Sequence, residues 1–194
     1  ALFRYVGDAL NVRVNCVFTD GSQPIGRGMG PALEARDVMN VLRNTADAPK
    51  DLREKSLDLC AHLLAMSNHG DAVAARQRAT ELLDDGTAWL QFEKICLAQG
   101  QLSDIPQAPH SKVLLAHQRG TISEIDNRRI ARLAKLAGAP RAVSAGLELY
   151  VHVGDSISRE QPLMAIHAES EGELDYALLY YLDNRDMISV AEEG

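Results

Sequence analysis

The sequence predicts a chain of helices and strands in two parts, joined by a linker over residues 101–110. Residues 1–100 have the order strand, glycine-rich loop and helices, which is the order of an α/β domain. Residues 111–194 predict a small mixed α+β domain. Two observations separate the parts. Helical spacing of apolar residues fills the first part after its glycine loop, whereas strand-like alternation appears only after the polar, proline-containing linker.

Composition limits the classes of protein to consider. Of the 194 residues, 46% are hydrophobic and 24% are charged, which is ordinary for a globular domain. A net charge of −7 argues against a nucleic-acid or anionic-membrane partner. Widely spaced Cys16, Cys60 and Cys96 predict buried thiols in a reducing compartment. No signal peptide or membrane-length apolar run is visible, so we expect a cytoplasmic location.

The first elements are a helix over residues 2–10 and a strand over residues 12–19. Glycines then stand at every second position, at Gly26, Gly28 and Gly30. Pro31 fits the first position of a helix over residues 31–43, because its missing N–H would have no partner there.

Spacing alone leaves three roles open for the glycine loop. It could be a tight connection between strand and helix. It could bind an anion through backbone amides at a helix N-terminus, although it matches no known phosphate fingerprint. It could also bind a hard cation through inward-facing carbonyls, with Asp37 as a carboxylate ligand.

Three more helices are expected before the linker. The first runs over residues 52–66 with Asp51 as its N-cap, and the next two begin at Asp71 and Thr87. Trp89 in the last of them is expected to be a core residue.

The second part alternates strands with two helices. One helix covers residues 127–137 with Asp126 as its cap, and the other follows a capping box from Ser170 to Glu173. The outward basic face of the first is either solvated or a contact between subunits. The expected strands are residues 112–116 and 120–125 around a turn, and residues 145–153, 162–168 and 187–190.

Several motifs, in this order, resemble the pyrimidine nucleoside phosphorylase family, which includes thymidine phosphorylase and AMP phosphorylase. The longest is DGSQPIGRGMGPALEARDVMNVL at residues 20–42. The others are DLRE at 51–54, FEK and AQG at 92–94 and 98–100, GTISEIDN at 120–127 and VHVGD at 151–155. The GPALEA version at residues 30–35 resembles the AMP phosphorylase branch more than ordinary thymidine phosphorylases.

The resemblance implies that residues 1–100 are the C-terminal part of a large α/β phosphorylase domain, mostly helices after one strand. Residues 111–194 would be the family's C-terminal α+β domain. Family enzymes are more than twice as long, so we expect a C-terminal fragment of a thymidine phosphorylase, a pentosyltransferase. The whole enzyme would use phosphate to release a base from a nucleoside or nucleotide, and would form a homo-oligomer without nucleic-acid or membrane partners. No position here matches the family's catalytic or substrate-binding groups, so the chain alone should be inactive.

One family site reaches this chain. Pyrimidine nucleoside phosphorylases bind a potassium ion through loop carbonyls and a carboxylate in the following helix. The resemblance places these ligands at Ile25, Gly28 and Asp37. The family usually has Glu at the position of Asp37. Potassium is the one cofactor that the resemblance implies.

Two functions are alternatives to thymidine phosphorolysis. An AMP phosphorylase would act on a nucleoside 5′-monophosphate, and a non-catalytic module would serve assembly only. Residues 120–126 and 152–170 also resemble the half-barrels of biotinyl and lipoyl carrier domains. Those carriers need a lysine on a hairpin, and the second half-motif has none, so barrel-sandwich-like strands are expected without the carrier function.

Overall fold

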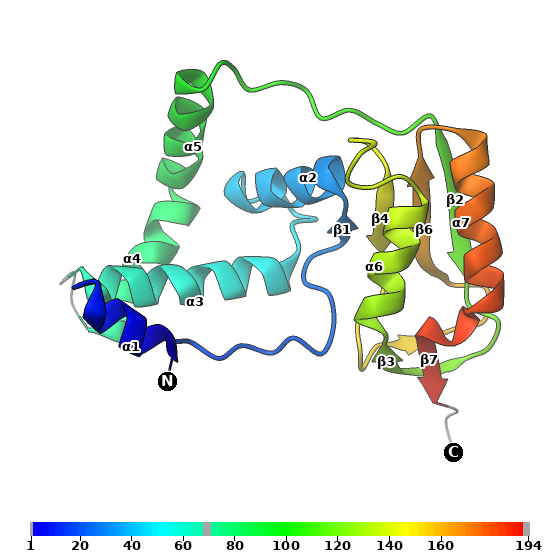
Figure 1. The fold of residues 1–194 in the computed structure, drawn as a ribbon, viewed down its shortest axis with the longest axis horizontal. Helices are drawn as coiled ribbons and strands as arrows, with labels where there is room; N and C mark the ends of the chain where they lie inside the picture. The colour runs from blue at the N-terminus through cyan, green and yellow to red at the C-terminus, as the bar shows by residue number, and fades with distance from the viewer. Residues whose placement is uncertain (1, 68–70, 192–194) are drawn as a thin grey trace.

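The computed structural model describes residues 2–67 and 71–191 and forms two adjoining parts (Figure 1). A helical part precedes an extended connection, and a mixed α+β domain with two antiparallel sheets follows it. The helices of the first part are α1 (Leu2–Ala9), α2 (Pro31–Leu42), α3 (Lys50–Met66), α4 (Ala72–Asp84) and α5 (Thr87–Ala98).

The second part contains α6 (Asn127–Leu136) and α7 (Glu171–Asp183). One sheet has the strand order β1-β4-β6-β2, and the other has the order β5-β3-β7. Their strands are β1 (Gly28–Met29), β2 (His110–Leu115), β3 (Gly120–Ile125), β4 (Gly146–Leu149), β5 (Ser156–Ile157), β6 (Pro162–Ala168) and β7 (Ile188–Ala191). The expected barrel-sandwich geometry stays a prediction.

The strand expected over residues 12–19 is absent, and this expectation was wrong. The segment is extended but forms no ladder with any described residue, and Phe18 is 97% exposed. A β-favouring sequence makes a strand only where a neighbouring strand accepts its hydrogen bonds. The strand that the first part does supply is β1, inside the glycine loop.

Two helix caps in the first part also differ from expectation. α3 begins at Lys50 with Pro49 as its cap, so Asp51 lies within the first turn. Gly86 caps α5, and the neighbouring Asp85 carboxylate accepts the amide of Thr87. Asp71 does cap α4, where its side chain accepts the amide of Ala74.

The sheet assignments need two corrections. β2 and β3 do not form a hairpin with each other, because β2 pairs with β6 and β3 pairs with β5 and β7. β4 ends at Leu149, four residues earlier than expected, because the chain turns where the Asp155 carboxylate accepts the amide of His152. The caps of the second part are confirmed: Asp126 accepts amides at the start of α6, and Ser170 accepts the amide of Glu173.

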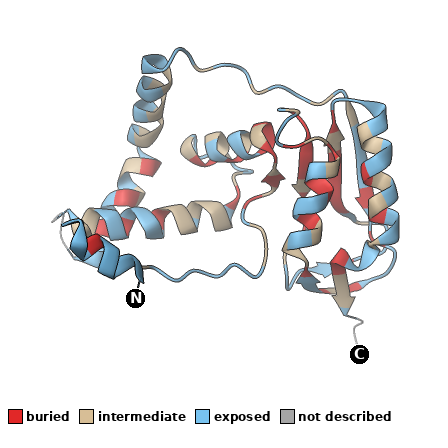
Figure 2. Cartoon of the chain, in the orientation of Figure 1, coloured by how far each residue is buried: buried red, intermediate tan, exposed pale blue. Residues whose placement is uncertain are grey.

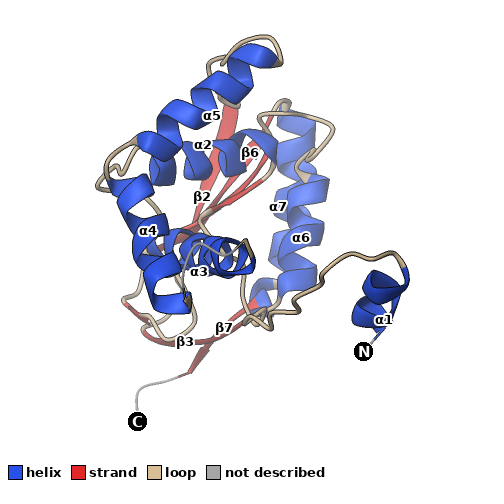
Figure 3. Ribbon diagram, turned by 90° about the vertical axis from the view of Figure 1, so that its left-hand side faces the viewer, coloured by secondary structure: helices blue, strands red, loops and turns tan. Residues whose placement is uncertain are grey.

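The main core lies in the second part, where α6 and α7 cover one face of the first sheet (Figures 2 and 3). Its largest fully buried side chains include Ile130, Leu133, Leu147, Met164 and Ile166. Each such apolar side chain contributes about 1.5–3 kcal/mol when it is fully buried. The helical part has only a small core, formed by Val41, Leu57, Ala79 and Leu83.

The helical part leaves more apolar surface open than the sequence suggests. Cys60 is exposed and Cys16 and Cys96 are half-buried, so the prediction of buried thiols was wrong. Trp89 is also only half-buried, and the Arg43 guanidinium carbon lies 4.1 Å from its ring centroid. The reason is geometric: α5 contacts few other elements and buries none of its residues, and Figure 3 shows α1 standing apart from the other helices.

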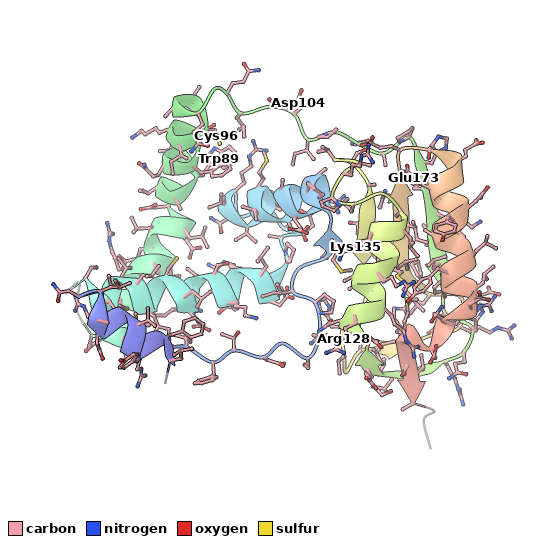
Figure 4. The ribbon with its side chains drawn as sticks, in the orientation of Figure 1. Trp89, Cys96, Asp104, Arg128, Lys135 and Glu173 are labelled. Carbon is pink, nitrogen blue, oxygen red and sulfur yellow. The ribbon has the colours of Figure 1, made fainter. Side chains whose placement is uncertain are left out.

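Two of the basic side chains of α6 interact with residues of the same domain. Arg129 pairs with Asp186, with 2.7 Å between nitrogen and oxygen, and Arg132 lies over the ring of Tyr180. Arg128 and Lys135 are exposed on the same helix (Figure 4).

Candidate functional site

The glycine loop is the point where the two parts of the chain join. Its strand β1 pairs with β4, and the Leu149 amide donates to the Arg27 carbonyl at 2.8 Å. Gly30 has φ of 139°, and a Cβ there would lie 2.3 Å from the Ala145 carbonyl oxygen. Only glycine allows both this conformation and this close approach. The loop therefore adds an edge strand to the sheet of the following domain.

The amides of the loop are occupied by carboxylates from this chain. Asp37 is 4% exposed, and its Oδ2 accepts the amides of Arg27 and Gly28 at 2.7 Å each. Asp51 Oδ2 accepts the Gly26 amide at 2.9 Å, and Glu34 Oε1 accepts the Gly30 amide at 3.0 Å. Hydrogen bonds to charged acceptors are the stronger kind.

This arrangement decides between two of the roles left open by the sequence. Four of the five amides from Gly26 to Gly30 point at internal carboxylates, so they are not available to a phosphate. The loop holds its own anions in the place where a phosphate loop would hold a ligand. The anion-binding role is therefore wrong for these amides.

The three residues expected to bind potassium lie around this same loop. The Arg27 carbonyl accepts the Leu149 amide on the β4 side, whereas the amides of Arg27 and Gly28 donate to Asp37. Gly28 lies opposite Glu148 in this ladder, and its amide donates to Asp37 instead of to β4. A Cβ placed on Gly26, next to Ile25, would lie 2.9 Å from Asp37 Oδ2.

The chemistry of these donors suits a hard cation. Both hydrogen bonds of Asp37 use Oδ2, and carbonyl and carboxylate oxygens are the ligands such ions prefer. Within residues 2–67 and 71–191, no three His, Cys, Asp or Glu side chains gather as a metal site. A cation at the loop would therefore depend on backbone carbonyls.

Contacts beyond the loop bind it to the turn after β4. His152 Nε2 lies 3.6 Å from Asp51 Oδ2, the atom that also accepts the Gly26 amide. The Val153 amide donates to Gln23 Oε1 at 2.8 Å. The turn 150–155 thus touches both the start of the loop and the carboxylate that holds it.

A second cluster, of Arg36, Glu148, Tyr150 and His167, lies beside the loop and was missed by the sequence reasoning. Arg36 on α2 pairs with Glu148 on β4 at 2.6 Å, and His167 Nε2 on β6 lies 3.6 Å from Glu148 Oε2. Interaction with His167, and then with Arg36, lowers the pKa of Glu148. Burial, and then the Glu148 charge, raises the pKa of Tyr150. Strand alternation was the available signal, because it puts Glu148 and Tyr150 on the face opposite Leu147 and Leu149.

Two hollows flank the loop. One, of ≈ 490 Å³, lies between α2, the connection and β6, where Arg36, His167 and Ser144 line it. The Ser144 hydroxyl donates to Glu169, so it does not form a serine–histidine pair. The other, of ≈ 460 Å³, lies between residues 17–25 and α3. Its Lys55 donates to the Asp20 carbonyl. Ser111 also lines the first hollow and lies opposite His167 in the β2–β6 ladder, but no hydrogen bond joins these two side chains in the described part of the chain.

In the part of the chain that the structure describes, every helix is too short or too polar to cross a membrane.

Residues 121–184, from β3 to the end of α7, match the family model of the pyrimidine nucleoside phosphorylase C-terminal domain.

Relatives match along almost the whole chain. A protein of Acidovorax sp. (strain JS42) named "Putative thymidine phosphorylase 1" is 47% identical over 97% of this chain. Proteins named "Putative thymidine phosphorylase" from Legionella pneumophila (strain Paris) and Polaromonas sp. (strain JS666) are each 46% identical over 100% of it. The chain spans 37%, 37% and 38% of the lengths of these three relatives.

Proposed function

From the membership of this chain in the thymidine and pyrimidine nucleoside phosphorylase family, we propose that it is part of a thymidine phosphorylase. The reaction is phosphorolysis, in which phosphate attacks the anomeric carbon of a nucleoside and releases the base and a sugar 1-phosphate. The observation that carries the proposal is the 47% identity with a relative bearing that name over 97% of the chain. That similarity includes both the glycine loop and the small domain.

The chain contributes support to this reaction and no catalytic group. The amides of the glycine loop are filled by Asp37, Asp51 and Glu34, so the reacting phosphate binds elsewhere in the whole enzyme. The loop instead connects the helical part to the small domain. We therefore expect the isolated chain to be inactive.

The proposed cation is potassium, held by the carbonyls of Ile25 and Gly28 and by the Asp37 carboxylate. The donor set supports this, since all three groups are hard oxygens around one loop. A bound cation would fix the loop conformation at the junction of the two parts. In the full-length protein, Asp37→Asn should raise the KCl concentration needed for half-maximal activity by about tenfold, since a formal charge is lost from the ligand set. An unchanged KCl dependence, with sodium and tetramethylammonium chloride as controls, would contradict the proposed site.

One observation favours a different substrate, and another favours an additional assembly role. The GPALEA version of residues 30–35 favours an AMP phosphorylase, which would act on nucleoside 5′-monophosphates. An assembly role for residues 111–194 is supported by α7, whose Tyr176, Leu179 and Leu182 are 62%, 61% and 50% exposed. Such an apolar stripe suits contact with another subunit, and it is compatible with either enzyme.

The deciding experiment is phosphate-dependent base release by the full-length protein, with thymidine, uridine and AMP offered separately. Chromatography quantifies the free base. Thymine release supports the proposed function, whereas adenine release from AMP alone replaces it with the AMP phosphorylase. The isolated chain serves as the control and should release nothing. Base release by the isolated chain would show that a catalytic group lies within it.

A further inference from the structure

We propose that Asp51 is a positioning residue for this reaction, through which the small domain sets the conformation of the glycine loop. This inference rests on the proposed function for its effect on catalysis. It does not rest on it for the geometry. Two contacts carry the inference: Asp51 accepts the Gly26 amide, and His152 faces the same carboxylate.

Three successive amides of the loop are divided between two helices. Asp51 in the first turn of α3 accepts the Gly26 amide at 2.9 Å, and Asp37 in α2 accepts the amides of Arg27 and Gly28. Gly26 is buried with φ of 72°, so its amide is out of reach of solvent and depends on Asp51 for an acceptor. Asp51 therefore fixes the entrance to the loop, while Asp37 fixes its middle.

The same atom of Asp51 faces the small domain. His152 Nε2 is buried, has no hydrogen-bond partner among the described residues and lies 3.6 Å from Asp51 Oδ2. A small movement would bring the two atoms within hydrogen-bonding distance. On the other side of the ring, Nδ1 lies 3.8 Å from Asp155 Oδ2, which accepts the His152 amide at 2.7 Å.

These contacts form one continuous path. Asp155 holds the turn that carries His152, His152 faces Asp51, and Asp51 holds Gly26. Gln23 adds a parallel contact, because its side chain accepts the amide of Val153. A displacement of the small domain therefore acts on the loop at Gly26, beside the residues proposed to bind potassium.

The first test compares Asp51→Asn, His152→Ala and Asp58→Asn in the full-length protein. Asp58 is the matched control, since it lies on α3, is exposed and pairs with Arg76 instead of the loop. We expect Asp51→Asn to lower kcat for thymidine about tenfold, the loss typical of one hydrogen bond to a charged group, with little change in KM. His152→Ala should lower kcat less. The double variant should be no slower than Asp51→Asn, because His152 acts through Asp51.

The second test does not need activity. Hydrogen exchange of the full-length protein, resolved to single amides, should show about tenfold faster exchange at Gly26 in Asp51→Asn, with Arg27 and Gly28 little changed. His152→Ala should also speed exchange at Gly26. A variant that merely unfolds α3 would instead speed exchange along the whole helix and not selectively at Gly26.

The outcomes separate this inference from the proposed function. If the wild-type protein is active but Asp51→Asn and Asp58→Asn are alike in kcat, the positioning role is overturned and the function stands. If the wild-type protein releases no base from any substrate, the proposed function fails, and the role of Asp51 in that reaction fails with it. Equal exchange at Gly26 in all variants overturns the path from the small domain to the loop, whatever the activity.

Discussion

The buried carboxylate of Asp37 is the strongest single support of the loop. Asp37→Ala would leave the amides of Arg27 and Gly28 without their acceptor in a buried position, which should lower the free energy of unfolding by about 2–4 kcal/mol. Asp58→Ala, an exposed change, should cost less than about 1 kcal/mol. Urea unfolding of both variants measures the difference. Equal losses would mean that the loop does not depend on Asp37.

Glu148 gives the junction a defined dependence on pH. Its pKa is lowered by His167 and Arg36, so the folded state binds the proton less tightly than the unfolded state does. Its contribution is therefore present above the ordinary carboxyl pKa and is lost as the pH falls through the lower, folded value. We expect Glu148→Gln to reduce the free energy of unfolding at pH 7, and the difference from wild type to shrink below about pH 4. A difference that stays constant from pH 7 to pH 3 would contradict this.

At this scale the sequence predicts only contacts that are close along the chain. The caps Asp71, Asp126 and Ser170 were predictable, because each accepts an amide two or three residues away. Asp51 was expected to be a cap by the same rule, yet its amide partner lies 25 residues away. Only the packing of α3 against the loop reveals that partner.

Among the elements, β1 depends most on one residue. Gly30→Ala would place a Cβ 2.3 Å from the Ala145 carbonyl oxygen and force an unfavourable φ, so β1 could not stay paired with β4. We expect a loss of about 2–3 kcal/mol in the free energy of unfolding. Gly21→Ala is the matched control, because a Cβ there meets nothing within 4 Å. Thermal unfolding of the two variants compares them, and similar midpoints would show that β1 tolerates a side chain.

Most helices were predictable from their periodicity, whereas the pairing of strands was not. α2, α6 and α7 lie where apolar spacing and turn residues put them. β2 and β3 have strand sequences that were recognised, but nothing in a strand's own residues says which sheet it joins. For the same reason β1, only two residues long within a glycine-rich loop, gave no strand signal.

In the whole molecule, the boundary that the linker marks in the sequence is not the boundary between the packed parts. The linker divides the sequence near residue 105, yet β1 belongs to the sheet of the second part, and Arg36 of α2 pairs with Glu148 of β4. The glycine loop and α2 are thus shared by both parts. A family model that begins at residue 121 leaves out this shared segment, although the relatives match it.

Residues 12–18 show what the rest of a longer protein should supply. The run is β-favouring, yet it forms no ladder with residues 2–67 or 71–191, and Val12 and Phe18 are 55% and 97% exposed. Because the chain spans 37% of the Acidovorax relative, we expect a neighbouring strand to cover this run in the full-length protein. Its amides should then exchange at least about a hundredfold more slowly in the full-length protein than in the isolated chain, as strand amides do. The mainly exposed residues 101–104 also lack a ladder in the part of the chain that the structure describes. They are the internal control and should show the same exchange in both proteins. Equal exchange of residues 12–18 in both proteins would show that this run is a connection, and that its apolar side chains are covered by no strand.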